Sequence, residues 1–246
     1  MLLLILLQSI TSLFIILVIW ILYKKSRDRT INIKKRLYQI PINQKRIESL
    51  IGIFNCLDIS IPLKQFNGFV CSPDLLSEII RKIFILKPRY VLELGSGVST
   101  IIIGKALEKN GFGKLISVEH LKSEYEKTND EIKIHKLEEV CVCNFSPLSE
   151  IQINDKKYNW YSIDYEKIEK KIDLMIVDGP PTHSSKEGSR FPALPLLKKY
   201  LSDDFEILVD DSKRKDEKMI LDQWSKLYPE LKFDHINLER GLAIIK

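Results

Sequence analysis

The strongest constraint on the fold is a regular alternation of strand-like and helix-like segments that begins near residue 72. Apolar runs with strand character occupy residues 90–94, 115–118, 138–143, 173–178 and 205–210, and helical periodicity fits residues 72–84, 98–109, 121–132, 191–201 and 214–227. This alternation predicts an α/β fold with a mostly parallel sheet and helices on both faces. Two final runs, near 231–237 and 240–245, are joined too closely for a crossover, so we expect them to form an antiparallel pair.

A second feature is an uncharged stretch at the N-terminus. Residues 2–22 contain no charged side chain, and a helix of this length spans roughly 30 Å, the thickness of a bilayer core. Trp20 and Tyr23 lie at one end, where amphipathic rings favour the membrane interface. We therefore expect residues 1–23 to form a transmembrane anchor. A cleaved signal peptide fits less well because no basic segment precedes the run, and a buried core helix fits less well because the run is apolar on all sides.

The net charge of +5 is concentrated directly after this stretch. Residues 24–46 carry nine basic side chains and one acid, Asp28, which amounts to +8, so the rest of the chain carries −3. The positive-inside rule then places the following domain in the cytoplasm, and the basic cluster would attract anionic headgroups of the lipid bilayer. The slightly acidic remainder argues against a nucleic-acid partner. We expect an anchor, then a basic linker with an amphipathic helix at residues 24–65, then a folded domain at residues 66–246.

The four cysteines predict neither a disulfide framework nor a zinc site. Cys56, Cys71, Cys141 and Cys143 are few and scattered for a chain of 246 residues. Cys141 and Cys143 are separated by a single residue within an apolar run. We therefore expect them to be buried thiols of a strand.

A glycine turn follows the strand-like run at 90–94. Gly95 and Gly97 let the backbone pass close to a ligand, and the helix after them offers free N–H groups. Glu119 ends the next strand, 22 residues after Gly97, where a carboxylate can accept hydrogen bonds from both hydroxyls of a ribose. These features predict a nucleotide-like cofactor, and a tight turn without a ligand is the alternative. A dinucleotide is disfavoured because Thr100 stands where its fingerprint needs a third glycine.

The segment Val91–Thr100, with the sequence VLELGSGVST, resembles motif I of the Rossmann-like S-adenosylmethionine-dependent methyltransferases, with Ser99 in place of the usual third glycine. Residues 118–120 are similar to the ribose-binding end of the second strand in that family. Residues 177–181, with the sequence VDGPP, resemble the fourth-strand motif of a subgroup that has a Gly-Ser-Gly-x-Ser-Thr turn. Later blocks of the same subgroup resemble residues 190–195, 209–212 and 239–243, so the resemblance runs from about residue 66 to the C-terminus.

The resemblance implies a Rossmann-like fold and S-adenosylmethionine as the cofactor. Glu93 and the glycine turn would hold the methionine end of the cofactor, Glu119 its ribose, and the loop at residues 144–147 its adenine. The expected cofactor-binding residues are Glu93, Gly95, Ser96, Gly97, Ser99, Thr100, Glu119, His120, Asn144 and Ser146.

Three aspartates end adjacent strands of the expected sheet and should mark the acceptor site. Asp178, Asp210 and Asp211 would repel one another unless a cation joins them, and Mg²⁺ with oxygen ligands is one solution. Metal-dependent O-methyltransferases of similar fold place acidic or amide residues at these strand ends. The resemblance thus makes the three aspartates the expected metal ligands, and the metal would lower the pKa of the acceptor hydroxyl. The alternative is that Asp210 and Asp211 cap the next helix or pair with Lys213 and Arg214.

The expected catalytic residues are Asp178 and His183. Related metal enzymes often carry a lysine three residues after the fourth-strand acid, where this chain has Pro181. His183 is the nearest titratable substitute in this loop, and a solvated loop histidine is the alternative. The polar segment at residues 182–189 could act as a lid over the site.

Three further side chains near the expected site have two interpretations each. Arg190 is expected to pair with an acid, either within the site or in a structural salt bridge. Trp160 and Tyr161 are expected in the core, with a place in the acceptor pocket as the alternative.

The sequence therefore predicts a membrane-anchored S-adenosylmethionine-dependent methyltransferase that acts on a hydroxyl of a small-molecule or glycan acceptor, with Mg²⁺ as an optional second cofactor. A non-catalytic membrane-tethered binding module of the same fold is the main alternative. Another transferase on the same scaffold, such as an aminopropyl transferase, is a third.

Overall fold

A computed structural model describes residues 1–63, 71–164, 168, 171–181 and 188–246. The predicted base His183 and most of the predicted lid lie outside these residues. The described chain divides into two compact units, Met1–Ile47 and Glu48–Lys246.

Helix α1, Leu2–Cys56, forms nearly all of the first unit. Its large apolar side chains between Ile10 and Tyr23 are exposed. Among the described residues, Gln8–Cys56 is the one helix long and apolar enough to cross a membrane by length and composition. Residues 24–42, the first part of the predicted basic linker, are helical with Pro41 inside the helix. This segment contains four lysines and three arginines, which have favourable helix propensity.

The second unit begins at Glu48, within the segment at residues 24–65 that the sequence predicts as a basic linker with an amphipathic helix. Ile53 and Leu57 are 1% and 2% exposed and belong to the hydrophobic core of this unit. The last two turns of α1 therefore fold with the domain, because they supply apolar side chains to its core.

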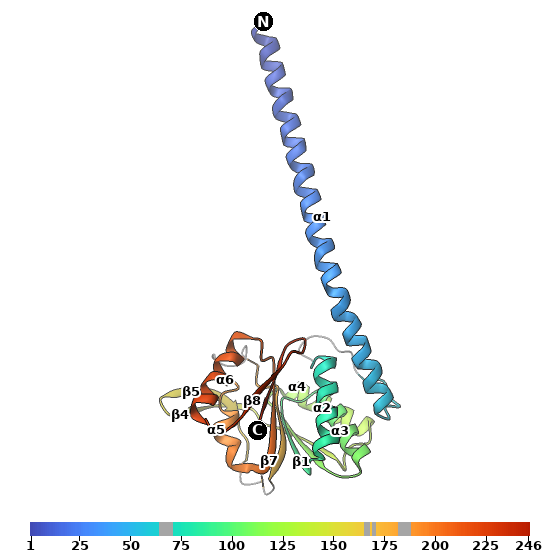
Figure 1. Cartoon of the computed structure of the whole chain (residues 1–246), viewed down its shortest axis with the longest axis vertical. Helices are drawn as coiled ribbons and strands as arrows, with labels where there is room; N and C mark the ends of the chain where they lie inside the picture. The colour runs from blue at the N-terminus through green and yellow to red at the C-terminus, as the bar shows by residue number, and fades with distance from the viewer. Residues whose placement is uncertain (64–70, 165–167, 169–170, 182–187) are drawn as a thin grey trace. The chain divides into compact units, whose positions relative to one another are not determined.

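A seven-stranded sheet forms the centre of the second unit, with the strand order β3-β2-β1-β6-β7-β9-β8. Figure 1 shows strands β1 and β7 of this sheet with helices beside them. Its strands are β1 (Tyr90–Leu94), β2 (Lys114–Glu119), β3 (Cys141–Phe145), β6 (Ile172–Val177), β7 (Leu201–Asp210), β8 (Phe233–Ile236) and β9 (Leu242–Ile245). Strand β1 pairs in parallel with β2 and β6, β2 with β3, and β6 with β7. Strand β9 is antiparallel to both β7 and β8. The predicted α/β, Rossmann-like fold with an antiparallel final pair is confirmed.

Helices cover the two faces of the sheet. The helices of the second unit are α2 (Pro73–Leu86), α3 (Val98–Asn110), α4 (Lys122–Ile134), α5 (Ala193–Leu197), the short 3₁₀ helix η3 (Lys198–Tyr200) and α6 (Lys215–Leu227). Apolar residues of α2, α3 and α4 join one core cluster with one face of the strands. Those of α5 and α6 join a second cluster with the other face.

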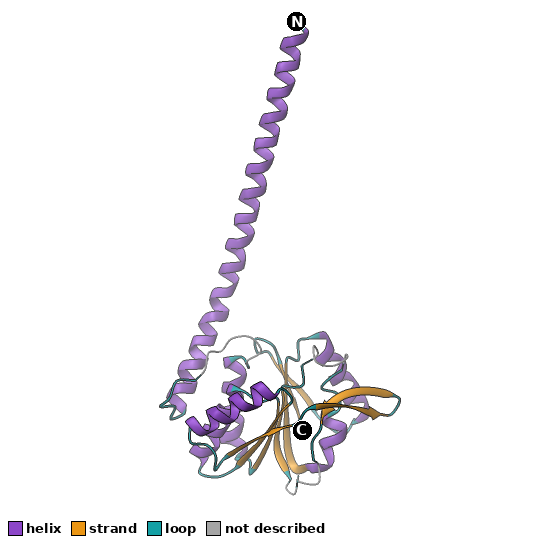
Figure 2. Cartoon of the chain, turned by 180° about the vertical axis from the view of Figure 1, so that it is seen from behind, coloured by secondary structure: helices purple, strands orange, loops and turns teal. Residues whose placement is uncertain are grey.

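A β-hairpin is the element that the sequence does not reveal. Strands β4 (Leu148–Ile153) and β5 (Lys156–Tyr161) form a separate antiparallel pair beside the main sheet, as Figure 2 shows. In the sequence the hairpin lies between β3 and β6, where a strict alternation of strands and helices would have a crossover helix. Trp160 and Tyr161 are 0% and 2% exposed and lie in the second core cluster, and the ring of Tyr158 stacks on Phe191 with centroids 5.2 Å apart.

Candidate cofactor and acceptor site

The glycine turn between β1 and α3 is locked to the neighbouring strands. Gly95 has φ 96°, in the left-handed region that favours glycine, and its N–H donates to the carbonyl of Val118 at 3.0 Å. A Cβ atom at Gly95 would lie 3.3 Å from the backbone nitrogen of Gly179, so the turn and the loop after β6 touch through their backbones. At Gly97 a Cβ atom would meet nothing within 4 Å. The backbone of the turn is therefore held by its neighbours at Gly95, whereas the space at Gly97 is open, which suits close approach of a ligand.

Glu93 supports this turn from inside the protein. Its side chain is fully buried, and the hydroxyl of Thr100 donates to its Oε2 at 2.6 Å while accepting from the N–H of Gly97 at 3.1 Å. Burial raises the pKa of Glu93 to about 7, although the hydroxyls of Ser99, Thr100 and Ser117 act to lower it. Glu93 therefore holds the backbone of the turn through Thr100, and its predicted place at the methionine end of the cofactor stays a prediction.

Glu119 ties the end of β2 to the same turn. Its Oε2 accepts from the backbone N–H of Ser96 at 3.1 Å, and its Oε1 accepts from the N–H groups of His120 and Leu121 at 2.7 and 2.8 Å. Burial raises the pKa of Glu119, but the hydrogen bonds from His120, Leu121 and Ser96 outweigh burial and leave the pKa below its usual value. The carboxylate is therefore held ionised and oriented beside the turn, as a ribose-binding acid needs to be.

The other expected cofactor residues surround these two acids. Ser99 and Ser146 are buried, and the ring of His120 meets that of Tyr161 edge-on with centroids 6.1 Å apart. The hydroxyl of Ser96 lies 3.0 Å from that of Thr128. Thr128, on α4, was not identified from the sequence.

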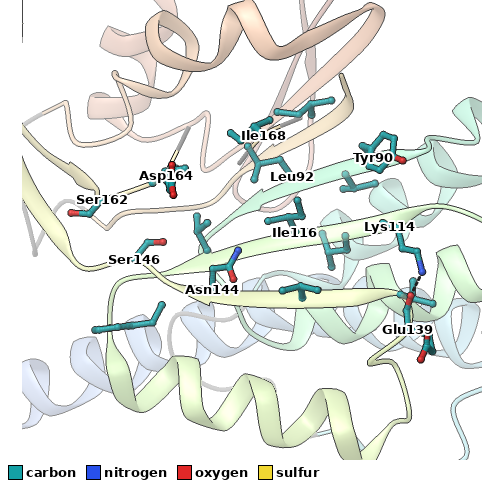
Figure 3. A pocket seen from close by; sticks show the side chains of 18 residues that line it. Tyr90, Leu92, Lys114, Ile116, Glu139, Asn144, Ser146, Ser162, Asp164 and Ile168 are labelled. Atoms are coloured by element: carbon teal, nitrogen blue, oxygen red, sulfur yellow. Dashed lines mark hydrogen bonds between the residues drawn. The ribbon is translucent and has the colours of Figure 1, made fainter. Parts of the chain in front are cut away.

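A cavity of about 610 Å³ runs along the face of β1, β2 and β3 (Figure 3). Asn144 and Ser146, the residues predicted near adenine, line it where the strands end, and Lys114 and Glu139 line it where the strands begin. Apolar side chains such as Ile116 form its floor. The predicted adenine loop therefore opens onto a largely apolar cavity.

Arg190 is the cation at the acidic edge of the sheet. Its guanidinium is 3% exposed and lies 3.3 Å from Asp178 Oδ1, 3.2 Å from Asp211 Oδ2 and 3.6 Å from Glu217 Oε1. It also donates to the backbone carbonyls of Asp178 and Asp210 at 2.8 and 3.1 Å. Arg190 therefore pairs with two of the aspartates that the sequence assigns to the acceptor site, within a buried network of ion pairs.

The three predicted metal ligands do not converge on one point. Asp211 turns toward the arginines and pairs with Arg214 at 2.7 Å, which was the alternative for this residue. The side chains that do converge are Cys71, Asp178 and Asp210, whose ligand atoms lie within 4.8 Å of one another. The thiol of Cys71 donates to Asp178 Oδ2 at 3.0 Å. Because this set combines a soft sulfur ligand with carboxylate oxygens, it fits Mg²⁺ poorly.

Burial and mutual repulsion favour protonation in this cluster. Burial and the neighbouring Asp178 and Asp211 raise the pKa of Asp210 to about 8. Burial also raises the pKa of Asp178, which the Arg190 guanidinium acts to lower, and burial raises the pKa of Cys71. A proton held by Asp210 and the charge of Arg190 together reduce the repulsion among the carboxylates.

Comparisons with known proteins agree with this fold. Residues 92–212, just under half of the chain, match the sequence model of a family described as "Methyltransferase domain". The search of curated proteins found no match.

Solved structures share the fold at low sequence identity. The S-adenosylhomocysteine-bound methyltransferase PaMTH1 of Podospora anserina is 14% identical with a TM-score of 0.56, over 80% of this chain and 87% of that one. The O-methyltransferase of Bacillus cereus in complex with S-adenosylhomocysteine is 11% identical with a TM-score of 0.53, over 82% and 89%. TomG of Streptomyces achromogenes, an O-methyltransferase involved in tomaymycin synthesis and solved with S-adenosylmethionine, is 10% identical with a TM-score of 0.53, over 72% and 81%.

The fold and the family match point to one class of protein. Residues 92–212 match a methyltransferase domain, and the solved structures that share the fold include methyltransferases bound to S-adenosylmethionine or S-adenosylhomocysteine.

Proposed function

We propose that this chain is a membrane-anchored enzyme that transfers the methyl group of S-adenosylmethionine to a hydroxyl oxygen of a small-molecule or glycan acceptor. The main support is that Glu93 and Glu119 both hold the glycine turn in place, while the space at Gly97 stays open beside the ionised carboxylate of Glu119. The resemblance to the subgroup with a Gly-Ser-Gly-x-Ser-Thr turn and an Asp-Gly-Pro-Pro loop is part of this proposal. The O-methyltransferases among the structural neighbours support oxygen as the accepting atom.

The residues at the turn would hold the cofactor. Backbone N–H groups at the start of α3 and the turn at residues 95–97 would receive its methionine end, Glu119 would accept hydrogen bonds from its ribose hydroxyls, and Asn144 and Ser146 would border its adenine. S-adenosylmethionine supplies a methyl group on a sulfonium centre, and its transfer leaves the thioether S-adenosylhomocysteine.

Asp178 would stand at the acceptor side of the site. As the acceptor oxygen forms its bond to the methyl carbon and the carbon–sulfur bond breaks, the proton of the hydroxyl must leave, and Asp178 is the carboxylate available to take it. Its side chain is 17% exposed, so it can reach an acceptor, and it is held by Arg190 on one oxygen and by Cys71 on the other. The raised pKa of Asp178 makes it a stronger base than an exposed aspartate.

The proposed reaction uses no divalent cation. The sequence predicts Mg²⁺ as the cation that neutralises three converging aspartates, but Arg190 contacts two of them and the converging set contains a thiol. The carboxylates thus already have a cation, and the donor set does not match the preference of Mg²⁺ for oxygen.

The membrane part of the proposal rests on α1. Its exposed apolar segment has the length of a membrane span, and the basic residues 24–46 follow it, so the proposed orientation puts the catalytic domain on the cytoplasmic side. An acceptor made or carried at the membrane surface would then be within reach.

The test combines cofactor binding with a methyl-transfer screen. The full-length chain in detergent should bind S-adenosylhomocysteine in calorimetric titration, and Glu119→Ala should abolish that binding while Glu108→Ala, an exposed acid on α3, should not. Absence of binding by folded wild-type protein would refute the proposal. Incubation with labelled S-adenosylmethionine and membrane-extract fractions, with and without EDTA, would identify the acceptor. Loss of methyl transfer in the presence of EDTA would show that the reaction requires a divalent metal.

The main alternative is a non-catalytic membrane-tethered module. It predicts no cofactor binding that depends on Glu119, and no labelled product in any extract fraction.

A further inference from the structure

The hydroxyl of Tyr161 lies where the glycine turn meets the loop after β6, and it has no hydrogen-bond partner among the described residues. Tyr161 ends strand β5, its side chain is 2% exposed, and its Oη atom has no partner among the described residues. A Cβ atom added to Gly179 would lie 2.2 Å from this oxygen, and the same point is 3.2 Å from the Cα of Gly95. The hydroxyl therefore sits where the glycine turn and the loop after β6 meet.

This position is the topological switch point of the sheet. From β1 the chain proceeds outward to β2 and β3 on one side, and then returns to β6 on the other side of β1. In open α/β sheets, ligands bind in the crevice outside the carboxyl ends of the strands at such a point. Tyr161 comes from the hairpin and not from the main sheet, and the sequence analysis considers it for the core or the acceptor pocket but not for the cofactor.

The surroundings of Tyr161 define what it can do. Burial raises the pKa of its phenol well above the usual value, and the negative charges of Glu119 and Asp178 act in the same direction. The group is therefore a neutral hydroxyl that can donate a hydrogen bond. A buried donor with no acceptor costs free energy, so an acceptor brought by a ligand would relieve that cost.

We propose that Tyr161 is a cofactor-binding residue whose hydroxyl donates a hydrogen bond to an oxygen of bound S-adenosylmethionine at the junction of Gly95 and Gly179. This inference rests on the proposed function, because it assumes that the cofactor occupies the glycine turn. It adds to the expected binding residues a side chain from the hairpin, between the ribose carboxylate Glu119 and the acceptor-side carboxylate Asp178.

The test compares Tyr161→Phe with Tyr158→Phe in the full-length chain in detergent. Both substitutions remove one hydroxyl from strand β5, but Tyr158 stacks on Phe191, which lies in the second core cluster. We expect Tyr161→Phe to raise the Kd for S-adenosylhomocysteine about 10-fold, as loss of one hydrogen bond does, and Tyr158→Phe to leave it unchanged. We also expect the melting temperature of ligand-free Tyr161→Phe to equal or exceed that of the wild type, because the variant no longer buries an unsatisfied donor.

Wild-type affinity in Tyr161→Phe would overturn the inference while leaving the proposed function intact. A fall in ligand-free melting temperature alongside it would show that a water molecule or another part of the chain satisfies the hydroxyl. If the wild type itself binds no S-adenosylhomocysteine, the proposed function fails and this inference fails with it.

Discussion

The side chains of Glu93 and Thr100 are joined by a hydrogen bond of 2.6 Å that connects the end of β1 to the first turn of α3. Because the same hydroxyl accepts from the N–H of Gly97, Thr100→Val should release the backbone of the glycine turn. We expect a loss of about 1–3 kcal/mol in the free energy of unfolding, since a buried carboxyl group loses its donor, and a weaker affinity for S-adenosylhomocysteine. Urea unfolding and calorimetric titration measure the two effects.

Thr100→Ser is the matched control for that change, because it keeps the hydroxyl and removes only a methyl group. It should retain most of the affinity of the wild type. Equal losses of affinity in the valine and serine variants would show that the methyl group, and not the hydrogen bond, maintains the turn.

The raised pKa of Glu93 predicts a pH dependence of stability. A carboxyl group with a folded pKa of about 7 and an ordinary value of 4.5 holds a proton in the folded state that the unfolded chain releases. Its contribution to stability is therefore present below about pH 4.5 and is lost as the pH rises to 7, with a total of up to about 3 kcal/mol. Glu93→Gln mimics the protonated acid and removes this pH dependence of the unfolding free energy.

The measurement for Glu93 is the difference in unfolding free energy between the wild type and Glu93→Gln as a function of pH. Wild-type stability relative to the variant should fall between pH 4.5 and 7. Asp210, whose pKa of about 8 gives a slope of the same sign, is present in both proteins and cancels in the difference. A difference that does not change with pH would show that Glu93 ionises normally.

The fold could be predicted from local pattern because most elements show their periodicity plainly. The runs ending at Leu94 and Glu119 became strands of the main sheet, as their apolar character indicates. The hairpin at residues 148–161 was missed, because its strands are short and carry several exposed polar side chains, and its stability depends on burial of Trp160 and Tyr161 against distant elements. The extent of α1 was also missed, since a basic segment with a proline suggests a linker.

The candidate site was predictable only where a strand end carries the signal. Glu119 and the glycine turn lie together as expected, because parallel strands bring their carboxyl ends to one edge. The roles of Glu93 and Asp211 depend on which neighbour each side chain faces, and the sequence does not contain that information. Cys71 and Tyr161 come from segments outside the motifs, so only the tertiary structure brings them to the site.

Arg190 gives a further prediction about stability. Its buried guanidinium lies near the carboxylates of Asp178, Asp211 and Glu217, so Arg190→Met would leave buried acids without their cation. We expect a loss of about 3–5 kcal/mol in the free energy of unfolding, as is typical when one partner of a buried ion pair is removed. Arg81→Met, which removes an exposed partner of Glu78, should change stability by less than about 1 kcal/mol. Similar small losses in both variants would contradict the assigned role of Arg190.

The space beside Gly179 is filled by two different groups, the hydroxyl of Tyr161 and the backbone of Gly95. In Gly179→Ala the new methyl group would lie 2.2 Å from Tyr161 Oη and 3.2 Å from the Cα of Gly95. The first contact requires the tyrosine to move and the second presses on backbone, so we expect a loss of about 1–3 kcal/mol from overpacking. Removing the hydroxyl in the double variant Gly179→Ala/Tyr161→Phe should recover part of that loss, and the contact with Gly95 should keep the recovery incomplete. Additive effects of the two substitutions in urea unfolding would show that Gly179 and Tyr161 do not share this space.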